Sequence, residues 1–213
     1  MKRVFNLLVV DESGSMSIIK RHALVGINET LTTIQKMQET HKNLEQRVTL
    51  ITFDSTHTNV FYDNVRASNA NPLKAKDYNP CGATPLYDAI GMGIAKINAL
   101  TTEDDSVLVT IITDGEENSS TEFDLKMVKR LIDKQKEQGW TFTFIGTDDL
   151  DVEGMAHEMG IKSFLSFSRN YESTSKMFSK DRASRAIFCS RTFRDERIDD
   201  AKYFVEGDEE KEE

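Results

Sequence analysis

The chain has 213 residues, of which 38% are hydrophobic and 30% are charged, and its formal net charge is −9. This composition is typical of a soluble globular protein with a sizeable core. The negative charge argues against nonspecific nucleic-acid binding as the main role. Only three prolines occur, so a proline-rich linker is not expected and most of the chain is predicted to form one domain.

The first residues and the cysteines bear on where the protein is located. The start "MKRVFNLLVVDESG" is basic and then apolar, but the apolar run meets Asp11 and Glu12 without a small-residue cleavage site. It is therefore interpreted as a core strand and not as a signal peptide. No apolar segment approaches the roughly 20 residues that span a bilayer. Cys81 and Cys189 form no CxxC motif and indicate no disulfide framework. These features predict a cytoplasmic protein without a membrane span.

The hydrophobic pattern predicts alternating strands and helices along the chain. In chain order the elements are a buried strand over 4–10, an amphipathic helix over about 17–42, a strand hairpin in "RVTLITFDS" and "NVFYDNV", a long loop, a helix in "TPLYDAIGMGIAKINAL", a strand in "SVLVTIITDG", a helix in "DLKMVKRLIDKQKEQ", a strand in "WTFTFIGTD", a short helix in "VEGMAHEMG", a strand in "SFLSF" and a helix over about 172–192. Thr84 is the expected N-cap of the second long helix, with Pro85 as its first residue. Such alternation predicts a mostly parallel sheet with helices on both faces.

Oxygen-bearing side chains are expected to meet at one edge of this sheet. Asp11 and Asp114 each end an apolar strand, Thr84 opens a helix on the same side, and Ser13 and Ser15 follow Asp11 at every second position. Ligands of open α/β sheets bind outside the carboxyl ends of the strands. Carboxylate and hydroxyl oxygens without nitrogen or sulfur suit a hard divalent cation. Helix capping by Asp and Ser is the alternative, and the convergence of three distant segments favours the metal site.

These motifs resemble the von Willebrand factor type A (vWA) domain and its metal-ion-dependent adhesion site. "DESGSMS" matches the DxSxS loop with Asp11, Ser13 and Ser15, "GATPLYDAI" supplies Thr84, and "IITDGEEN" supplies Asp114. The resemblance covers roughly residues 1–190, which it identifies as a vWA domain of the stand-alone, intracellular, bacterial type. Residues 191–213 are left as a C-terminal extension with an acidic tail.

The resemblance implies a fold and a role for each matched residue. It implies a Rossmann-like three-layer sandwich whose six-stranded, mostly parallel sheet has one antiparallel edge strand. It further implies that Ser13 and Ser15 coordinate Mg²⁺ directly, that Thr84 and Asp114 do so directly or through water, and that Asp11 acts through water. Mn²⁺ and Ca²⁺ are alternative ions. Since neutral hydroxyls leave the cation electrophilic, a partner's Asp or Glu is expected to complete its coordination.

The predicted function is thus a metal-dependent protein-protein interaction module and not an enzyme. The alternative is a Mg²⁺-dependent phosphatase-like hydrolase of the haloacid dehalogenase type, which also places an aspartate after its first strand. That mechanism needs a general acid two residues later, where this chain has Ser13. Acidic residues within or beside the motifs, Glu12, Glu116 and Glu117, would repel an acidic partner if they faced the site.

The segment 176–197 is rich in Lys and Arg. It is interpreted as a solvated helix face partly paired with the acidic tail, with a nucleic-acid or acidic-partner patch as the alternative.

Overall fold

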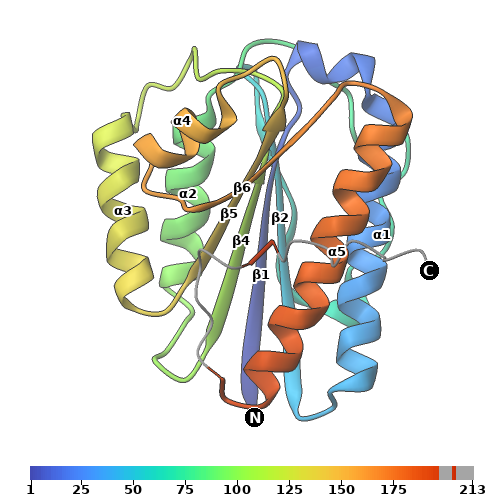
Figure 1. The fold of residues 1–213 in the computed structure, drawn as a ribbon, viewed down its shortest axis with the longest axis vertical. Coiled ribbons are helices and arrows are strands. Elements are labelled where there is room, and N and C mark those ends of the chain that lie inside the picture. The colour runs from blue at the N-terminus through green and yellow to red at the C-terminus, as the bar shows by residue number, and fades with distance from the viewer. Residues whose placement is uncertain (197–202, 205–213) are drawn as a thin grey trace, which may run out of the picture.

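The computed structural model describes residues 1–196 and 203–204, and it contains a six-stranded sheet covered by helices on both faces (Figure 1). The strands are β1 (Lys2–Asp11), β2 (Leu44–Phe53), β3 (Thr58–Arg66), β4 (Ser106–Ile112), β5 (Thr141–Thr147) and β6 (Ser163–Phe167). The α-helices are α1 (Lys20–Thr40), α2 (Leu86–Asn98), α3 (Leu125–Glu137), α4 (Val152–Glu158) and α5 (Tyr171–Phe193), with short 3₁₀ turns η1 (Gly14–Ile18) and η2 (Ala67–Asn69). The α/β sandwich predicted from the sequence is confirmed.

The strand order β3-β2-β1-β4-β5-β6 places β1 near the middle of the sheet. All neighbouring strands are parallel except β2 and β3, so β3 is the predicted antiparallel edge strand. Asp11 at the end of β1 pairs with Phe53 at the end of β2, and Val10 pairs with Ile112 at the end of β4. Strands β1, β2 and β4 therefore end at one edge of the sheet, uppermost in Figure 1, which we call the rim.

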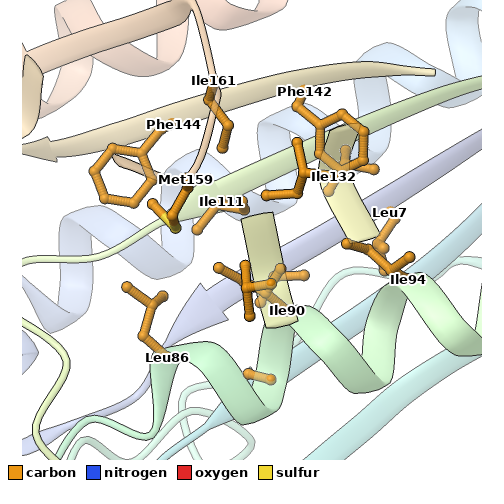
Figure 2. Packing of buried hydrophobic residues seen from close by; sticks show 14 of the residues in the cluster. Leu7, Leu86, Ile90, Ile94, Ile111, Ile132, Phe142, Phe144, Met159 and Ile161 are labelled. Atoms are coloured by element: carbon orange, nitrogen blue, oxygen red, sulfur yellow. The ribbon is translucent and has the colours of Figure 1, made fainter. Parts of the chain in front are cut away.

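Two apolar layers enclose the sheet, which explains the nearly continuous hydrophobic run of β1. Leu7 packs into the cluster that contains α2 and α3, whereas its neighbour Leu8 packs into the cluster that contains α1 and α5. Figure 2 shows Leu86, Ile90 and Ile94 of α2 on the first side, facing the strands. Because side chains alternate along a strand, both faces of β1 must be apolar to be covered.

The structure corrects the starts of two predicted helices. The helix predicted over 17–42 begins at Lys20, because the chain first turns through η1, where Met16 N donates to Ser13 O at 3.1 Å. Thr84 is not the N-cap of α2; Pro85 takes that position. The backbone of Thr84 is instead bound by Asn118, whose side-chain oxygen accepts from Thr84 N at 2.8 Å. This contact leaves Thr84 outside the helix and at the rim.

The C-terminal part of the chain bears on two further predictions. Helix α5 runs without interruption across residue 190, and Tyr203 beyond it is buried against α5. The division into 1–190 and 191–213 stays a prediction, and the acidic tail lies outside the described residues. Segment 176–197 is not uniformly solvated, because Arg185 is only 1% exposed. Within the described ranges, no helix has the length and apolarity needed to cross a bilayer.

Candidate metal centre

The five residues singled out in the sequence all lie at the rim. Asp11 ends β1, Asp114 follows β4 by two residues, and Thr84 directly precedes the N-cap of α2. Ser13 precedes η1 and Ser15 lies within it. All except Ser15 are almost fully buried, with exposed fractions between 0% and 3%.

Backbone hydrogen bonds join the serine loop to the loop before α2. Gly14 N donates to Gly82 O at 3.1 Å, and Cys81 N donates to Glu12 O at 2.9 Å. Gly82 has a φ of +68°, a conformation that favours glycine. These bonds bring residues about seventy positions apart in sequence into register at the rim, so the approach of Thr84 to the serines is built into the backbone.

The carboxylate of Asp11 is held by hydrogen bonds on both oxygens. Oδ1 accepts from the backbone N of Ser13 at 2.6 Å, and Oδ2 accepts from the hydroxyl of Thr113 at 2.6 Å. Burial raises the pKa of Asp11 to about 6, the hydrogen bonds from Thr113 and Ser13 oppose this rise, and the Asp114 carboxylate adds to it. The metal-free site therefore carries unfavourable negative charge, which a cation would relieve.

The two serines connect Asp11 to Asp114. The Oγ atoms of Ser13 and Ser15 lie 3.2 Å apart, and Ser15 Oγ donates to Asp114 Oδ1 at 2.5 Å. A row of oxygen atoms thus links the ends of β1 and β4.

Gly115 leaves space where these oxygens meet. A Cβ atom on Gly115 would lie 3.1 Å from Thr84 Oγ1, 3.7 Å from Ser15 Oγ and 3.9 Å from Asp11 Oδ2. Three oxygens from two chain segments, the serine loop and the loop before α2, therefore lie around the position that a side chain of residue 115 would take. A carboxylate and two hydroxyls around such a point fit a hard divalent cation, which takes oxygen ligands and keeps several waters.

The donor set also indicates the class of ion. Among residues 1–196 and 203–204, no group of three or more His, Cys, Asp or Glu side chains is arranged to hold a metal. The candidate centre instead combines two carboxylates with three hydroxyls, so it lacks the nitrogen and sulfur ligands typical of zinc sites.

Two contacts at this site were not found from the sequence. Thr113 binds Asp11, and its place directly before Asp114 in "IITDG" was a local signal that could have been used. Arg169, from the loop between β6 and α5, lies with its Nε 3.1 Å from Asp114 Oδ2. A single arginine in a loop gives no sequence signal of such a role.

Two of the three acidic residues near the motifs are engaged in the scaffold. Glu12 is buried and accepts hydrogen bonds from Thr52 Oγ1 and from the backbone of Asn79. Glu117 accepts from the backbone N of Tyr87 at 2.9 Å, near the start of α2. These hydrogen bonds fix both carboxylates in the scaffold, and of the three residues only Glu116 is exposed.

The haloacid dehalogenase alternative gains no support from this arrangement. Ser13 stands where that mechanism requires an acid, and the carboxylate of Glu12 accepts a hydrogen bond from Thr52.

Cys81 is exposed, and a hydrogen bond to the Asp54 carboxylate at 3.2 Å raises the pKa of its thiol. A raised thiol pKa disfavours the nucleophilic thiolate.

Solved structures with the same fold include several proteins of pili. The pilus adhesin SpaC from Lactobacillus rhamnosus GG, in its open conformation, superposes with a TM-score of 0.65 at 18% identity, covering 91% of this chain and 30% of that one. The PilB minor pilin from Streptococcus sanguinis superposes with a TM-score of 0.61 at 12% identity, covering 87% of this chain and 61% of the pilin. The vWF domain of the type V pili tip protein Mfa5 from Porphyromonas gingivalis superposes with a TM-score of 0.59 at 12% identity, covering 84% of this chain and 94% of that domain.

At these identities the similarity shows the fold alone, and this chain spans less than two thirds of the length of SpaC and PilB. No curated protein matches the chain in sequence. The prediction of a cytoplasmic location is contradicted by the structural comparison, because the similar structures are pilus adhesins and minor pilins, which are displayed at surfaces. That prediction depended on unpaired cysteines and on the first residues, and neither feature determines where a folded domain acts.

The family follows from sequence and fold together. The model of the von Willebrand factor type A domain matches residues 7–180, which is most of the chain. The six-stranded sheet with one antiparallel edge and the helices on both faces agree with that match. The protein belongs to the von Willebrand factor type A domain family.

Proposed function

We propose that this vWA domain binds Mg²⁺ at the rim through Asp11, Ser13, Ser15, Thr84 and Asp114, and that the ion binds a carboxylate of a protein partner. Members of this family are protein-interaction modules that often depend on a metal. The observation that carries the proposal is the group of oxygens from Thr84, Ser15 and Asp11 that lies on the side of Gly115 where no side chain stands.

The residues of such a site would supply two kinds of ligand, neutral and charged. Ser13, Ser15 and Thr84 offer neutral oxygens, while Asp11 and Asp114 supply two negative charges, the number that balances one divalent ion. Bound Mg²⁺ would supply Lewis acidity toward a carboxylate oxygen from outside. Because three of the five ligands are neutral hydroxyls, the cation would keep the electrophilic character that a carboxylate from outside needs. Recognition of this kind needs no general acid or base, so the proposal is for a binding module and not for an enzyme.

The metal half of the proposal is tested by thermal unfolding with and without Mg²⁺. A ligand at a hundredfold excess over its Kd stabilises the folded state by about 2.7 kcal/mol, so we expect a rise in Tm of several degrees for the wild type. Asp11→Ala and Ser13→Ala should lose this rise and stay folded. Ser184→Ala is a matched control, because Ser184 is similarly buried but lies on α5. The same rise in wild type, Asp11→Ala and Ser13→Ala would refute the metal assignment.

The partner half needs a separate experiment. Proteins retained by the immobilised wild-type chain in Mg²⁺, absent with Ser13→Ala and released by a chelator, are candidate partners. We expect binding to be lost when one exposed Asp or Glu of such a partner is replaced by its amide. Retention that is unaffected by every such replacement would contradict the carboxylate in the proposal.

A further inference from the structure

The guanidinium of Arg169 bridges two carboxylates at the rim. Its Nε donates to Asp114 Oδ2 at 3.1 Å, its Nη2 donates to the carbonyl oxygen of Asp114, and its Nη1 contacts Asp149. The Asp114 side chain is fully buried, whereas that of Asp149 is 54% exposed. Since Ser15 Oγ donates to Asp114 Oδ1, both carboxylate oxygens of Asp114 already accept hydrogen bonds from the protein.

Local structure fixes Arg169 in this position. The preceding residue is held by a hydrogen bond from Ser168 N to Ser173 Oγ at 2.8 Å. The following residue, Asn170, is the N-cap of α5 and accepts from Ser173 N at 2.9 Å. An arginine between two anchored residues loses little further freedom on pairing with a carboxylate, so its charge stays next to Asp114.

This placement changes the charge of the proposed metal site. Asp11 and Asp114 alone would balance a divalent cation, but Arg169 adds a permanent positive charge beside Asp114. Asp149 offsets that charge only in part, because water screens an exposed carboxylate far more than a buried one. We propose that Arg169 sets the charge of the site, weakening the binding of the free cation and making the loaded site more positive toward an acidic partner.

This inference, which rests on the proposed function, makes Arg169 a positioning residue for charge and not a ligand. It predicts opposite effects on two affinities. Without Arg169 the cation binds more tightly, because two uncompensated carboxylates face it, and a carboxylate from outside binds the loaded site less tightly. A purely structural role for Arg169 predicts something different, since a displaced Asp114 would weaken both.

The test measures Mn²⁺ binding to the full chain by electron paramagnetic resonance, with Mn²⁺ as the probe for the divalent site. We expect Arg169→Gln to bind Mn²⁺ roughly tenfold more tightly than the wild type, a size typical of changes next to metal ligands. Arg169→Lys keeps the charge and should stay close to the wild type. Arg66→Gln is the matched control, because Arg66 is also paired with a carboxylate but ends β3, at the edge of the sheet away from the rim.

A second variant keeps the test valid if Arg169→Gln does not fold. Asp149 is exposed, so Asp149→Asn should fold, and it should weaken Mn²⁺ binding by a few-fold because Arg169 then acts on Asp114 without a counter-charge. The second readout is acetate binding to the Mn²⁺-loaded protein, followed by water proton relaxation. Acetate should bind Arg169→Gln more weakly than the wild type.

The outcomes separate this inference from the proposed function. If the wild type binds Mn²⁺, Ser13→Ala does not, and Arg169→Gln binds no more tightly than the wild type, the site stands and the role of Arg169 is overturned. An Arg169→Lys variant that behaves like Arg169→Gln would also overturn it, because charge would then not be the cause. Absence of Mn²⁺ binding in the wild type and in every Arg169 variant would refute both.

Discussion

Asp114 and Asp181 are both buried aspartates that contact an arginine, and the two pairs differ in what surrounds them. At the rim, Asp114 pairs with Arg169, which remains partly exposed. Beneath α5, Asp181 pairs with Arg185 at 3.3 Å, and both side chains are almost fully buried. Burial and charge pairing are thus shared by a region proposed to bind a ligand and by one enclosed in the protein.

The protein supplies most of the hydrogen-bond partners of the α5 pair, although the buried Nε of Arg185 has none. Arg185 donates to Asn6 Oδ1 at 3.1 Å and to Thr110 Oγ1 at 2.7 Å, while Tyr203 donates to Asp181 Oδ1 at 3.0 Å. At the rim, by contrast, two hydroxyl oxygens and one carboxylate oxygen lie around the side of Gly115 that carries no side chain. A buried ion pair is therefore weak evidence for a functional site, and oxygens from distant segments that converge beside a glycine are better evidence.

The largest predicted effect follows from breaking the enclosed pair. Arg185→Met leaves the carboxylate of Asp181 buried without a cation, which should lower the free energy of unfolding by about 3–5 kcal/mol. Arg182→Met is the matched control on the same helix. Because the ion pair of Arg182 with Glu29 is partly exposed, this substitution should lower the free energy of unfolding by less than about 1 kcal/mol. Urea unfolding measures both.

The same two variants should leave the Mg²⁺ response of Tm unchanged, because Arg185 contacts Asn6 and Thr110 within the strands and not the rim oxygens. A Mg²⁺ response lost with Arg185→Met, at a temperature where that variant is still folded, would contradict the separation of the two regions.

The second prediction concerns pH and the rim. The pKa of Asp11 rises from 3.8 to about 6 because of burial first, opposed by Thr113 and Ser13, and the Asp114 carboxylate adds to the rise. The folded, metal-free protein then binds a proton more tightly than the unfolded chain. Protonation of Asp11 therefore stabilises the folded state, and its contribution to the free energy of unfolding is complete below about pH 4. This contribution, roughly 3 kcal/mol, is lost as the pH rises to about 6.

Unfolding in a chelator between pH 4 and pH 7.5 checks this sign, with Asp11→Asn as the control that cannot titrate. As the pH rises through this window, we expect the free energy of unfolding of Asp11→Asn to increase relative to that of the wild type. Mg²⁺ should stabilise the wild type above about pH 6 and lose its effect below, because protons then compete for Asp11. A wild type whose stability relative to Asp11→Asn rises with pH in the chelator would show that the sign is wrong.

Much of the fold could be predicted from the sequence because its signals are local. The apolar run of β1 extends over both faces of the sheet, and the polar turn between β2 and β3 predicted the antiparallel hairpin that the structure confirms. The edge position of β3 was implied by the family resemblance and is also confirmed. The start of α1 could not be placed, because η1 has the composition of a helix cap and only the backbone bond from Met16 N to Ser13 O distinguishes the two.

The candidate site was partly predictable for the same reason. Asp11 and Asp114 were placed together because parallel strands end at one edge, and the structure shows Ser15 between them. Arg169 is 55 residues from Asp114 in sequence, and nothing local marks it. Arg185 was grouped with a solvated basic run, since residue type alone does not show which side of a helix faces the sheet.

The smallest effect on stability, and the sharpest effect on the site, is predicted for Gly115→Ala. The φ of Gly115 lies outside the positive range, so alanine is compatible with the backbone. Its methyl group would lie 3.1 Å from Thr84 Oγ1 and 3.7 Å from Ser15 Oγ, against two of the proposed ligands. We expect a loss of about 1 kcal/mol in the free energy of unfolding from this crowding, together with loss of the Mg²⁺-dependent rise in Tm.

Gly93→Ala is the control, because it crowds neighbouring side chains in the core and leaves the proposed metal site unchanged. Its Cβ would lie 3.2 Å from Leu7 and 3.3 Å from Ile51 in the core beneath α2, so it should cost about as much stability while the Mg²⁺ response persists. If Gly115→Ala keeps that response, the space beside Gly115 is not where the cation binds. The oxygens of the rim would then be, like those around Arg185, a network that only holds the fold together.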